Sequence, residues 1–408
     1  MNKVPFYSFL VGKTSLALAE VIYIMAITTF IYQKTASALI ASLFPLLQAM
    51  ANLVAGLVFP LVLRKLPFSK LLRGLPCIRA ILLTLLLVSF EFITGNIYVQ
   101  LIHVLIISFI GGLEKPILNS IIPKLVAKEH LVKANSSISV TTQSAQIAGY
   151  SFTGFAVIHW GHHPTLFFTA ALIWMAVLCI FHTSKYTAQD EGIAQVNESK
   201  WYLIKEGWAF LWHNQTLRMV TLMDVIEGAA GSIWIGAITL VYVKEALNRG
   251  EQWWGFINAS YCIGSIIGGL LTLLLANFIQ RYLIVSMAVG SLLFSLFTLI
   301  YGLTSVPILA LFLCVAMGPA YQIRDVAQQT AFQLNIESQH LPKVYASQGI
   351  LLSIVTGFSI FLMGFIADYI GVRAVYIFGS ILIFISAILS LSLVQAGKRI
   401  VPNEDFKS

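Results

Sequence analysis

Nine charged side chains interrupt long apolar stretches of this 408-residue chain. Two of them are adjacent, Glu114 and Lys115, and a second adjacent pair, Arg324 and Asp325, lies in a later stretch. A charge at membrane depth costs about 2.5–3.5 kcal/mol even on the mildest scale, so such residues usually line a path for ions, protons or substrates. The full set is Lys13, Glu20, Arg79, Glu114, Lys115, Asp224, Glu227, Arg324 and Asp325.

The composition around these charges is that of a polytopic membrane protein. Hydrophobic residues make up 58% of the chain and charged residues only 10%, against about 25% charged in soluble domains. The mean hydropathy is +0.85. No basic cluster is interleaved with aromatic residues in a polar segment, so the net charge of +8 indicates membrane topology rather than nucleic-acid binding.

A membrane-spanning helix needs about 20 apolar residues, and on that measure the sequence predicts twelve helices. The first run is too long for a cleaved signal peptide and lacks a small-residue cleavage site, so we expect it to remain as a helix. The twelve predicted helices span 6–31, 35–63, 76–94, 98–120, 135–158, 164–184, 216–243, 252–278, 282–303, 306–332, 344–370 and 371–396.

The longest polar stretch divides these helices into six and six. We expect an N-terminal half over 1–184, a cytoplasmic linker over 185–215, a C-terminal half over 216–396 and a cytoplasmic tail over 397–408. Within the linker, apolar residues recur at helical spacing from Trp201 to Trp212, which predicts a helix along the inner membrane surface.

Lysine and arginine set the predicted orientation. With the N-terminus inside, about sixteen of these residues fall in cytoplasmic segments and about four in outer loops. The asymmetry predicts a multi-pass protein of the plasma membrane with both termini in the cytoplasm.

The two halves carry signs of an internal repeat. At an offset of 210 residues, Glu114-Lys115 falls on Arg324-Asp325 with the signs reversed. At an offset of 211, Lys13 falls on Asp224. Identical residues at the offset of 210 are His130, Leu131, Lys133, Gly154 and Gly161, matched by His340, Leu341, Lys343, Gly364 and Gly371. Two parallel six-helix repeats are the architecture of major facilitator transporters.

Three local motifs carry a family resemblance. They are Ile122–Val126, then Leu131–Ser136 followed by Gln143, Gln146–Gly149 and Gly154, and in the second half Gly364–Arg373. Together they resemble the major facilitator superfamily, in particular its macrolide-efflux-like branch of drug:proton antiporters. One departure is that Gly56 is followed four residues later by Pro60 where the family usually has Asp. The usual carboxylate of an inner-gate latch is therefore missing.

The resemblance implies that predicted helices 6–31, 98–120, 216–243 and 306–332 line a central cavity. Eight of the nine buried charges lie on these four helices. We therefore interpret Lys13, Glu114, Lys115, Arg324 and Asp325 as cavity or gate charges, and expect some to pair across the halves. The ninth charge, Arg79, is expected to support a helix end.

Carboxylates deeper in these helices are candidates for proton coupling. Burial or a like-charged neighbour favours the neutral form of a carboxyl group, which suits it to carry protons. Glu20 lies near the middle of its helix, and Asp224 and Glu227 share one helix face at i, i+3. The alternative for each is a structural ion pair with Lys13 or Arg324.

Polar and aromatic residues on the same helices are candidate substrate contacts. They are Tyr23, Asn119, Trp234, Tyr321, Gln322 and Gln328. The predicted packing glycines, where helices approach closely, are Gly149, Gly154, Gly268 and Gly364. In the family, glycines of the fifth helix are associated with exporters, and this sequence has part of that pattern.

These features predict a secondary active transporter, a proton-coupled exporter of small amphipathic or polar compounds by alternating access. The alternatives are an exporter of a siderophore or other secreted metabolite, and a solute importer of the same fold. No GK[ST] phosphate loop, catalytic triad or metal-ligand set is present, and the histidines near residue 160 are interpreted as an interfacial loop. We expect no enzyme activity, no cofactor and no metal, with the proton gradient as energy source. The expected partners are substrate, protons and the lipid bilayer, and we expect a monomer.

Overall fold

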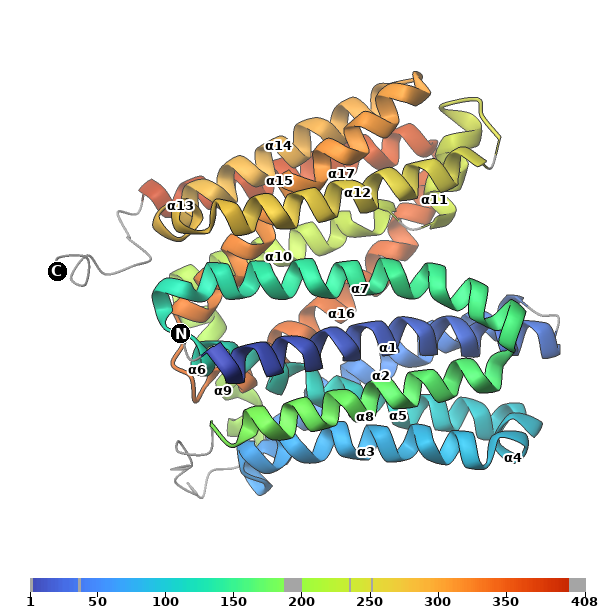
Figure 1. The fold of residues 1–408 in the computed structure, drawn as a ribbon. Helices are drawn as coiled ribbons and strands as arrows, with labels where there is room; N and C mark the ends of the chain where they lie inside the picture. Colours follow the sequence, from blue (N-terminus) through green and yellow to red (C-terminus); the bar gives the residue numbers. More distant parts are fainter. Residues whose placement is uncertain (1–2, 36–37, 187–199, 235, 251, 396–408) are drawn as a thin grey trace. The chain divides into compact units, whose positions relative to one another are not determined.

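The computed structural model describes residues 3–35, 38–186, 200–234, 236–250 and 252–395. Within these ranges the chain is helical and forms no strand (Figure 1), which confirms the predicted all-α fold. Part of the predicted linker, 187–199, and the predicted tail, 397–408, lie outside the described residues.

The helices of the first half of the chain follow the predicted runs. They are α1 (Lys3–Thr35), α2 (Ala38–Lys65), α3 (Phe68–Val88), α4 (Phe90–Gly95), α5 (Ile97–Ser120), α6 (Ile122–Leu125), the 3₁₀ turn η1 (Lys128–His130), α7 (Leu131–Trp160) and α8 (His162–Ser184).

The second half begins with the predicted linker helix. Its elements are α9 (Lys200–His213), α10 (Gln215–Gly231), the 3₁₀ turn η3 (Ser232–Trp234), α11 (Gly236–Glu245), α12 (Gln252–Leu274), α13 (Ala276–Arg281), α14 (Leu283–Leu303), α15 (Pro307–Leu334), α16 (Leu341–Tyr369) and α17 (Val372–Gln395).

Ten helices among the described residues are long and apolar enough to cross a membrane, and the α10–α11 pair, bent by 54°, would be an eleventh span. The remaining predicted span corresponds to α7, which has 30 residues but a polar first half around Asn135 and Gln143. The predicted continuous helix over 216–243 is wrong in one respect, because it breaks at η3. Gly231, a poor helix former, ends α10 there.

One predicted helix start is also wrong. The third helix is predicted to begin at residue 76, but α3 begins at Phe68 and continues through Pro76. Membrane helices tolerate proline where neighbouring groups satisfy the freed carbonyl. The earlier start moves Arg79 from the end of the helix to its interior.

The described residues form two compact units. Unit 1 comprises Met1–Ala127, Thr141–Trp208 and Ser338–Ile350, and unit 2 comprises Lys128–Val140, Ala209–Glu337 and Leu351–Ser408. In unit 1, α1 packs on α2 and α8, and α5 packs on α2 and α3. In unit 2, α15 packs on α12 and α14, and α17 packs on α10 and α14.

Each unit contains a short segment from the other predicted half, and the two segments correspond at the offset of 210 residues. The start of α7 belongs to unit 2, where Asn135 Nδ2 donates to Thr330 Oγ1 at 3.0 Å and to Gln333 Oε1 at 2.9 Å. The start of α16 belongs to unit 1, where Lys343 Nζ lies 2.5 Å from Glu206 Oε2.

Two glycines mark the repeat in the backbone. Gly161 between α7 and α8 has a φ of 81°, and Gly371 between α16 and α17 has a φ of 109°. These are the positive-φ glycines of the described chain, and they lie 210 residues apart. Only a residue without a Cβ adopts such angles at low cost.

Other glycines bring helix backbones into contact. In unit 2, a Cβ on Gly268 would lie 2.5 Å from the Gly318 carbonyl oxygen, and a Cβ on Gly318 would overlap the Gly264 backbone. In unit 1, a Cβ on Gly149 would lie 3.2 Å from both Leu18 and Val21 side chains. Small residues permit this close approach in membranes, so Gly149 and Gly268 pack as predicted.

Gly154 and Gly364 lack close contacts within their own units, and their role as packing glycines stays a prediction. A Cβ on either residue would meet no atom of the described chain within 4 Å. Each lies on a helix face that no described helix of its own unit approaches closely, and sequence spacing alone does not distinguish them from Gly149 and Gly268.

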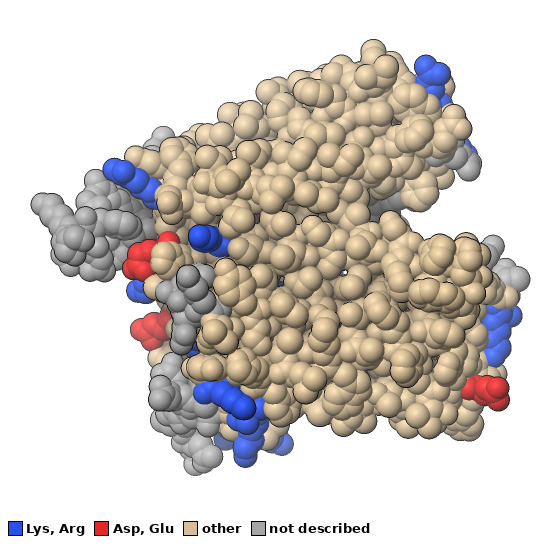
Figure 2. All heavy atoms as spheres, viewed as in Figure 1, with Lys and Arg blue, Asp and Glu red and all other residues tan. Residues whose placement is uncertain are grey.

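The surface fits a lipid environment. Large apolar side chains are widely exposed, including Val88, Ile158 and Leu274 at about 80%. On the face drawn in Figure 2, the Lys and Arg side chains lie toward the ends of the helices. Such exposure would be costly in water but not against lipid tails.

We predict that Gly318→Ala destabilises the protein while Gly364→Ala does not. The added methyl at residue 318 must separate α12 from α15, and such overpacking typically costs about 1–3 kcal/mol. Alanine at residue 364 enters open space and raises helix propensity by about 1 kcal/mol. The thermal unfolding midpoint of each purified variant checks this; equal midpoints for Gly318→Ala and the unsubstituted protein would contradict the close crossing.

Candidate functional site

Four charged side chains meet inside unit 1. Arg79 on α3 lies 3.1 Å from Glu114 on α5, and both are almost fully buried. Glu20 on α1 lies 3.8 Å from Arg79 and 3.8 Å from Lys115 on α5. The sequence prediction that Arg79 supports a helix end is therefore wrong: it neutralises a buried carboxylate.

The fold leaves room for this arginine by omitting a side chain opposite it. A Cβ on Gly111 of α5 would lie 3.7 Å from the Arg79 guanidinium carbon, so a longer side chain would compete for the same space. One residue on, Gly112 lets α2 approach, because a Cβ there would lie 2.7 Å from that of Ala55. The two glycines together bring α2, α3 and α5 around the charges.

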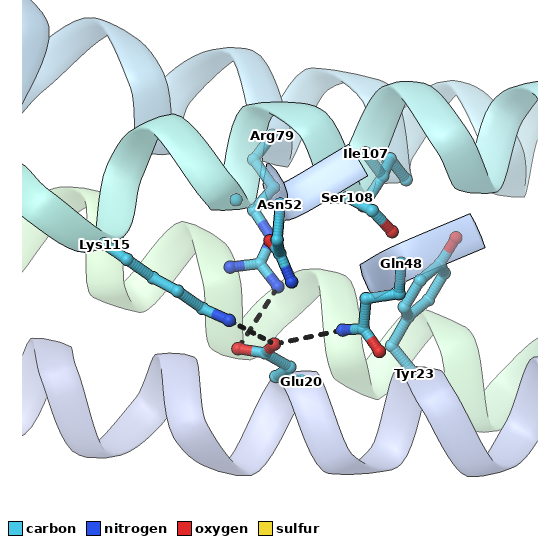
Figure 3. A pocket seen from close by; sticks show the side chains of 9 residues that line it. Glu20, Tyr23, Gln48, Asn52, Arg79, Ile107, Ser108 and Lys115 are labelled. Atoms are coloured by element: carbon cyan, nitrogen blue, oxygen red, sulfur yellow. Dashed lines mark hydrogen bonds and ion pairs between the residues drawn. The ribbon is translucent and has the colours of Figure 1, made fainter. Parts of the chain in front are cut away.

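A pocket opens beside the cluster (Figure 3). Its lining residues are Glu20, Tyr23, Gln48, Asn52, Arg79, Ile107, Ser108, Gly111 and Lys115. In Figure 3 the side chains of Arg79, Lys115 and Gln48 converge on the Glu20 carboxylate, and Gln48 Nε2 donates to Glu20 Oε1 at 3.3 Å.

The two ion pairs of Glu20 are longer and more exposed than the Arg79–Glu114 pair. Arg79 and Glu114 have side chains only 8% and 3% exposed and are hydrogen-bonded. Lys115 is 53% exposed and Glu20 is 27% exposed. An exposed pair contributes about 1 kcal/mol or less, whereas removing one partner of a buried pair costs about 3–5 kcal/mol. The Arg79–Glu114 pair is therefore the costly one to separate, and the Lys115–Glu20 pair is the least costly of the three.

Three polar atoms around the pocket have no hydrogen-bond partner in the part of the chain that the structure describes. They are the Tyr23 hydroxyl, Arg79 Nε and Glu114 Oε1. The Tyr23 residue is only 4% exposed. Unpaired buried polar groups are costly, so water or a ligand group is expected beside them.

A second charged cluster lies in unit 2 and centres on Glu227 of α10. Its Oε2 lies 3.2 Å from Arg324 Nε and accepts from Gln328 Nε2 at 3.0 Å, both on α15. Its Oε1 accepts from Ser291 of α14 at 3.2 Å and from Ser386 of α17 at 2.5 Å. A single carboxylate thus joins four helices.

Aromatic rings and a close helix crossing position the arginine of this cluster. The Arg324 guanidinium lies 4.7 Å from the Tyr321 ring centre and 5.4 Å from that of Phe294. A Cβ on Gly290 of α14 would lie 2.8 Å from Arg324 Cβ. Trp234 is part of the aromatic core beside it, with ring centres 5.4 Å from Tyr301 and 5.6 Å from Tyr376.

Three of the remaining predicted site residues, Lys13, Asn119 and Gln322, have partners within their own unit. Lys13 Nζ donates to Asn119 Oδ1 at 2.9 Å. The fully buried Gln322 accepts from Ser139 at 2.8 Å. Asp224 and Asp325 are half-buried on α10 and α15.

The predicted pairs Lys13–Asp224, Glu114–Arg324 and Lys115–Asp325 each join one unit to the other and stay predictions. Within its own unit, Glu114 already has Arg79 and Arg324 already has Glu227. The structural alternative for Glu227, a pair with Arg324, is realised, while Glu20 pairs with Arg79 and Lys115 rather than with Lys13.

Sequence reasoning missed the neutral partners of the carboxylates. Gln48 and Asn52 lie one turn apart in the apolar middle of α2, and that spacing was an available signal. Ser291 and Ser386 gave none, because serine is common in membrane helices as a packing residue. Across the described ranges, no group of three His, Cys, Asp or Glu side chains is arranged to hold a metal ion.

Comparisons with known proteins agree with this architecture. A family model described as "Transmembrane secretion effector" matches residues 23–403. The MFS-type transporters YfmI and YjbB of Bacillus subtilis are 33% and 30% identical, over 98% and 95% of this chain and 99% and 94% of their own. Macrolide efflux protein A of Streptococcus pyogenes is 22% identical over 95% of both chains.

Solved structures support the fold alone. A bacterial homologue of the iron transporter ferroportin, in its outward-facing state, gives a TM-score of 0.78 at 10% identity and covers 96% of this chain and 99% of its own. The transporter FucP in the outward conformation gives 0.74 at 14% identity, with the same coverage. Since the family model spans nearly the whole chain and two relatives reach 30% identity, the protein belongs to the transmembrane secretion effector family of major facilitator superfamily transporters.

Proposed function

We propose that this protein is a proton-coupled exporter of small amphipathic or polar compounds that works by alternating access. The observation that carries the proposal is the Glu227 cluster: a carboxylate buried in a membrane helix and opposed by an arginine. The similarity to macrolide efflux protein A favours export. No cofactor is needed, because an inward-moving proton supplies about 2.3 kcal/mol per 100 mV.

Glu227 is suited to convert protonation into movement. As a carboxylate it holds α10 to α14, α15 and α17 through Ser291, Arg324 and Ser386. A proton on Glu227 removes the attraction to Arg324 and leaves the arginine in need of another anion. Proton binding to Glu227 and the packing of α10 on its neighbours in unit 2 are therefore coupled in one conformational equilibrium.

The other proposed coupling carboxylates lie nearby on the same helix or in the other cluster. Asp224 precedes Glu227 by one turn of α10 and is half-buried, which suits it to pass protons to Glu227. Glu20 faces the unit 1 pocket and is more exposed. We assign it to proton or substrate binding at that pocket.

The remaining candidate cavity residues have different partners, and we propose their roles from those partners. Tyr23 lines the unit 1 pocket, and Asn119 holds Lys13. Trp234 and Tyr321 lie in the aromatic surroundings of Arg324. Gln328 is bound to Glu227, so we propose that it positions the carboxylate rather than the substrate.

The protein is proposed to lie in the plasma membrane as a monomer with both termini in the cytoplasm. The asymmetry of lysine and arginine between alternate loops supports this orientation.

The proposed export is tested by accumulation of erythromycin, ethidium and norfloxacin in cells that lack or overproduce the protein. We expect deletion to raise, and overproduction to lower, steady-state accumulation of at least one compound by about two-fold or more. An uncoupler should abolish the difference. A difference that survives the uncoupler contradicts proton coupling, and lower accumulation on deletion indicates import.

The role of Glu227 is tested with Glu227→Gln and with the double variant Glu227→Gln/Arg324→Gln. The single variant leaves Arg324 buried and unpaired, so we expect a loss of about 3–5 kcal/mol in stability together with loss of proton-driven transport. The double variant removes both charges and should recover stability but not proton dependence. Unfolding midpoints and transport into proteoliposomes under an imposed pH gradient separate the two effects.

The matched control is Glu245→Gln, since Glu245 is exposed at the end of α11. It should retain both stability and transport. Proton-driven transport by the double variant at the unsubstituted rate would show that Glu227 is not the coupling site.

The orientation is tested by fusing alkaline phosphatase or green fluorescent protein to the C-terminus. We expect fluorescence and no phosphatase activity, because phosphatase is active only outside the cytoplasm. The reverse result would contradict the proposed topology.

A further inference from the structure

We propose that the unit 1 pocket binds the head group of a zwitterionic substrate, with its cation against Glu20 and its anion against Lys115. The inference rests on the proposed transport function and specifies the class of compound that this pocket accepts. It is carried by the geometry of the Glu20–Lys115 pair, by its exposure and by the polar groups around it.

The pair is held apart at a distance that direct hydrogen bonding does not use. Glu20 Oε1 and Lys115 Nζ are 3.8 Å apart, and Glu20 Oε2 and Arg79 are also 3.8 Å apart. A charge-assisted N–H···O bond is about 2.7–2.9 Å long. Arg79 and Glu114, at 3.1 Å, approach that length.

The loosely held charges are also those that a ligand can reach. Lys115 and Glu20 are 53% and 27% exposed, whereas Arg79 and Glu114 are almost fully buried. They come from different helices, α5 and α1, and their charged ends extend toward one another along the pocket (Figure 3). The pocket as it stands has room for about one water molecule, so a head group enters when the exposed Lys115 side chain moves aside, which leaves the buried pair in place.

A zwitterion is the ligand that satisfies both charges. An ammonium and a carboxylate inserted between Glu20 and Lys115 replace one long ion pair with two short ones. A cation alone would take Glu20 and leave Lys115 without its carboxylate, and an anion alone would do the reverse. Since each single-signed ligand leaves one of the two charges without an opposite charge, both bind less favourably than a zwitterion, and the pocket selects against them as well as for the zwitterion.

Neutral groups beside the pair supply further contacts. The buried Tyr23 hydroxyl has no hydrogen-bond partner among the residues that the structure describes. Asn52 and Ser108 add hydrogen-bonding groups, and Ile107 adds an apolar wall. The pocket therefore favours a compact zwitterion, with its ammonium and carboxylate attached to one carbon that also carries an apolar body.

The test uses matched ligands that differ only in charge. Tryptophan and leucine are zwitterions, their methyl esters are cations and their N-acetyl derivatives are anions. Binding to the purified full-length protein is measured by isothermal titration calorimetry in phosphatidylglycerol nanodiscs, which contain no zwitterionic lipid. We expect at least one of the two zwitterions to bind ten-fold or more tightly than its ester and its N-acetyl derivative.

Two neutralising variants should shift selectivity in opposite directions. Glu20→Gln should lower zwitterion affinity about ten-fold and favour the anion over the cation. Lys115→Gln should lower it similarly and favour the cation over the anion. The conservative variants Glu20→Asp and Lys115→Arg should keep the zwitterion preference, and their unfolding midpoints show whether the fold is retained. The controls Glu91→Gln and Lys128→Gln, at exposed positions, should match the unsubstituted protein.

Three results would overturn the inference. They are zwitterions that bind no better than their single-signed derivatives, equal shifts in Glu20→Gln and Lys115→Gln, and loss of the preference in both conservative variants despite a retained fold.

Adding phosphatidylethanolamine to the nanodiscs separates a free ligand from a lipid head group, because only a lipid-binding pocket would then lose its affinity for the free zwitterion. Binding is measured without a gradient, so a chain that shows this selectivity but no proton-driven export would overturn the proposed function and leave this inference intact.

Discussion

The cost of a charge inside a membrane-spanning helix governs both polar clusters of this protein. Arg79 with Glu114, and Arg324 with Glu227, each place opposite charges about 3 Å apart, and all four side chains are almost fully buried. A buried pair adds little net stability, but separating it is expensive. Such pairs therefore act as specific connections between helices. The less tightly paired charges next to them, such as Glu20 and Lys115, remain able to bind other groups.

Helix packing is arranged to keep these connections short. Gly111 leaves space for the Arg79 guanidinium, and Gly290 brings α14 against the Arg324 Cα–Cβ bond. In the absence of a hydrophobic drive between helices in lipid, backbone contact at glycines supplies much of the association. The same contacts set the positions of the charged side chains, so in each unit the packing and the chemistry depend on the same residues.

The sequence was sufficient for the class of protein, the helix content and the set of helices that carry charge. Long apolar runs and the penalty for buried charge are strong signals, and they found Glu20, Glu114, Glu227 and Arg324. Pairing was harder to predict, because it depends on which helix faces meet. Taking Pro76 as a helix boundary misplaced Arg79, and Ser386 meets Glu227 only through the packing of α17 on α10. Gly154 and Gly364 show the same limit, since spacing along one helix does not show whether a neighbour lies opposite.

The turn glycines Gly161 and Gly371 bear on how the chain evolved. Side chains at most corresponding positions of the two halves differ, and some have exchanged the sign of their charge, as at Glu114 and Arg324. The left-handed backbone at the two turns admits few substitutes for glycine, so the same residue occupies both. A chain descended from a duplicated six-helix ancestor would keep this pair of glycines. The steric requirement at such a turn tolerates fewer substitutions than a requirement for a particular charge. The signs of the buried charges could then diverge between the two halves.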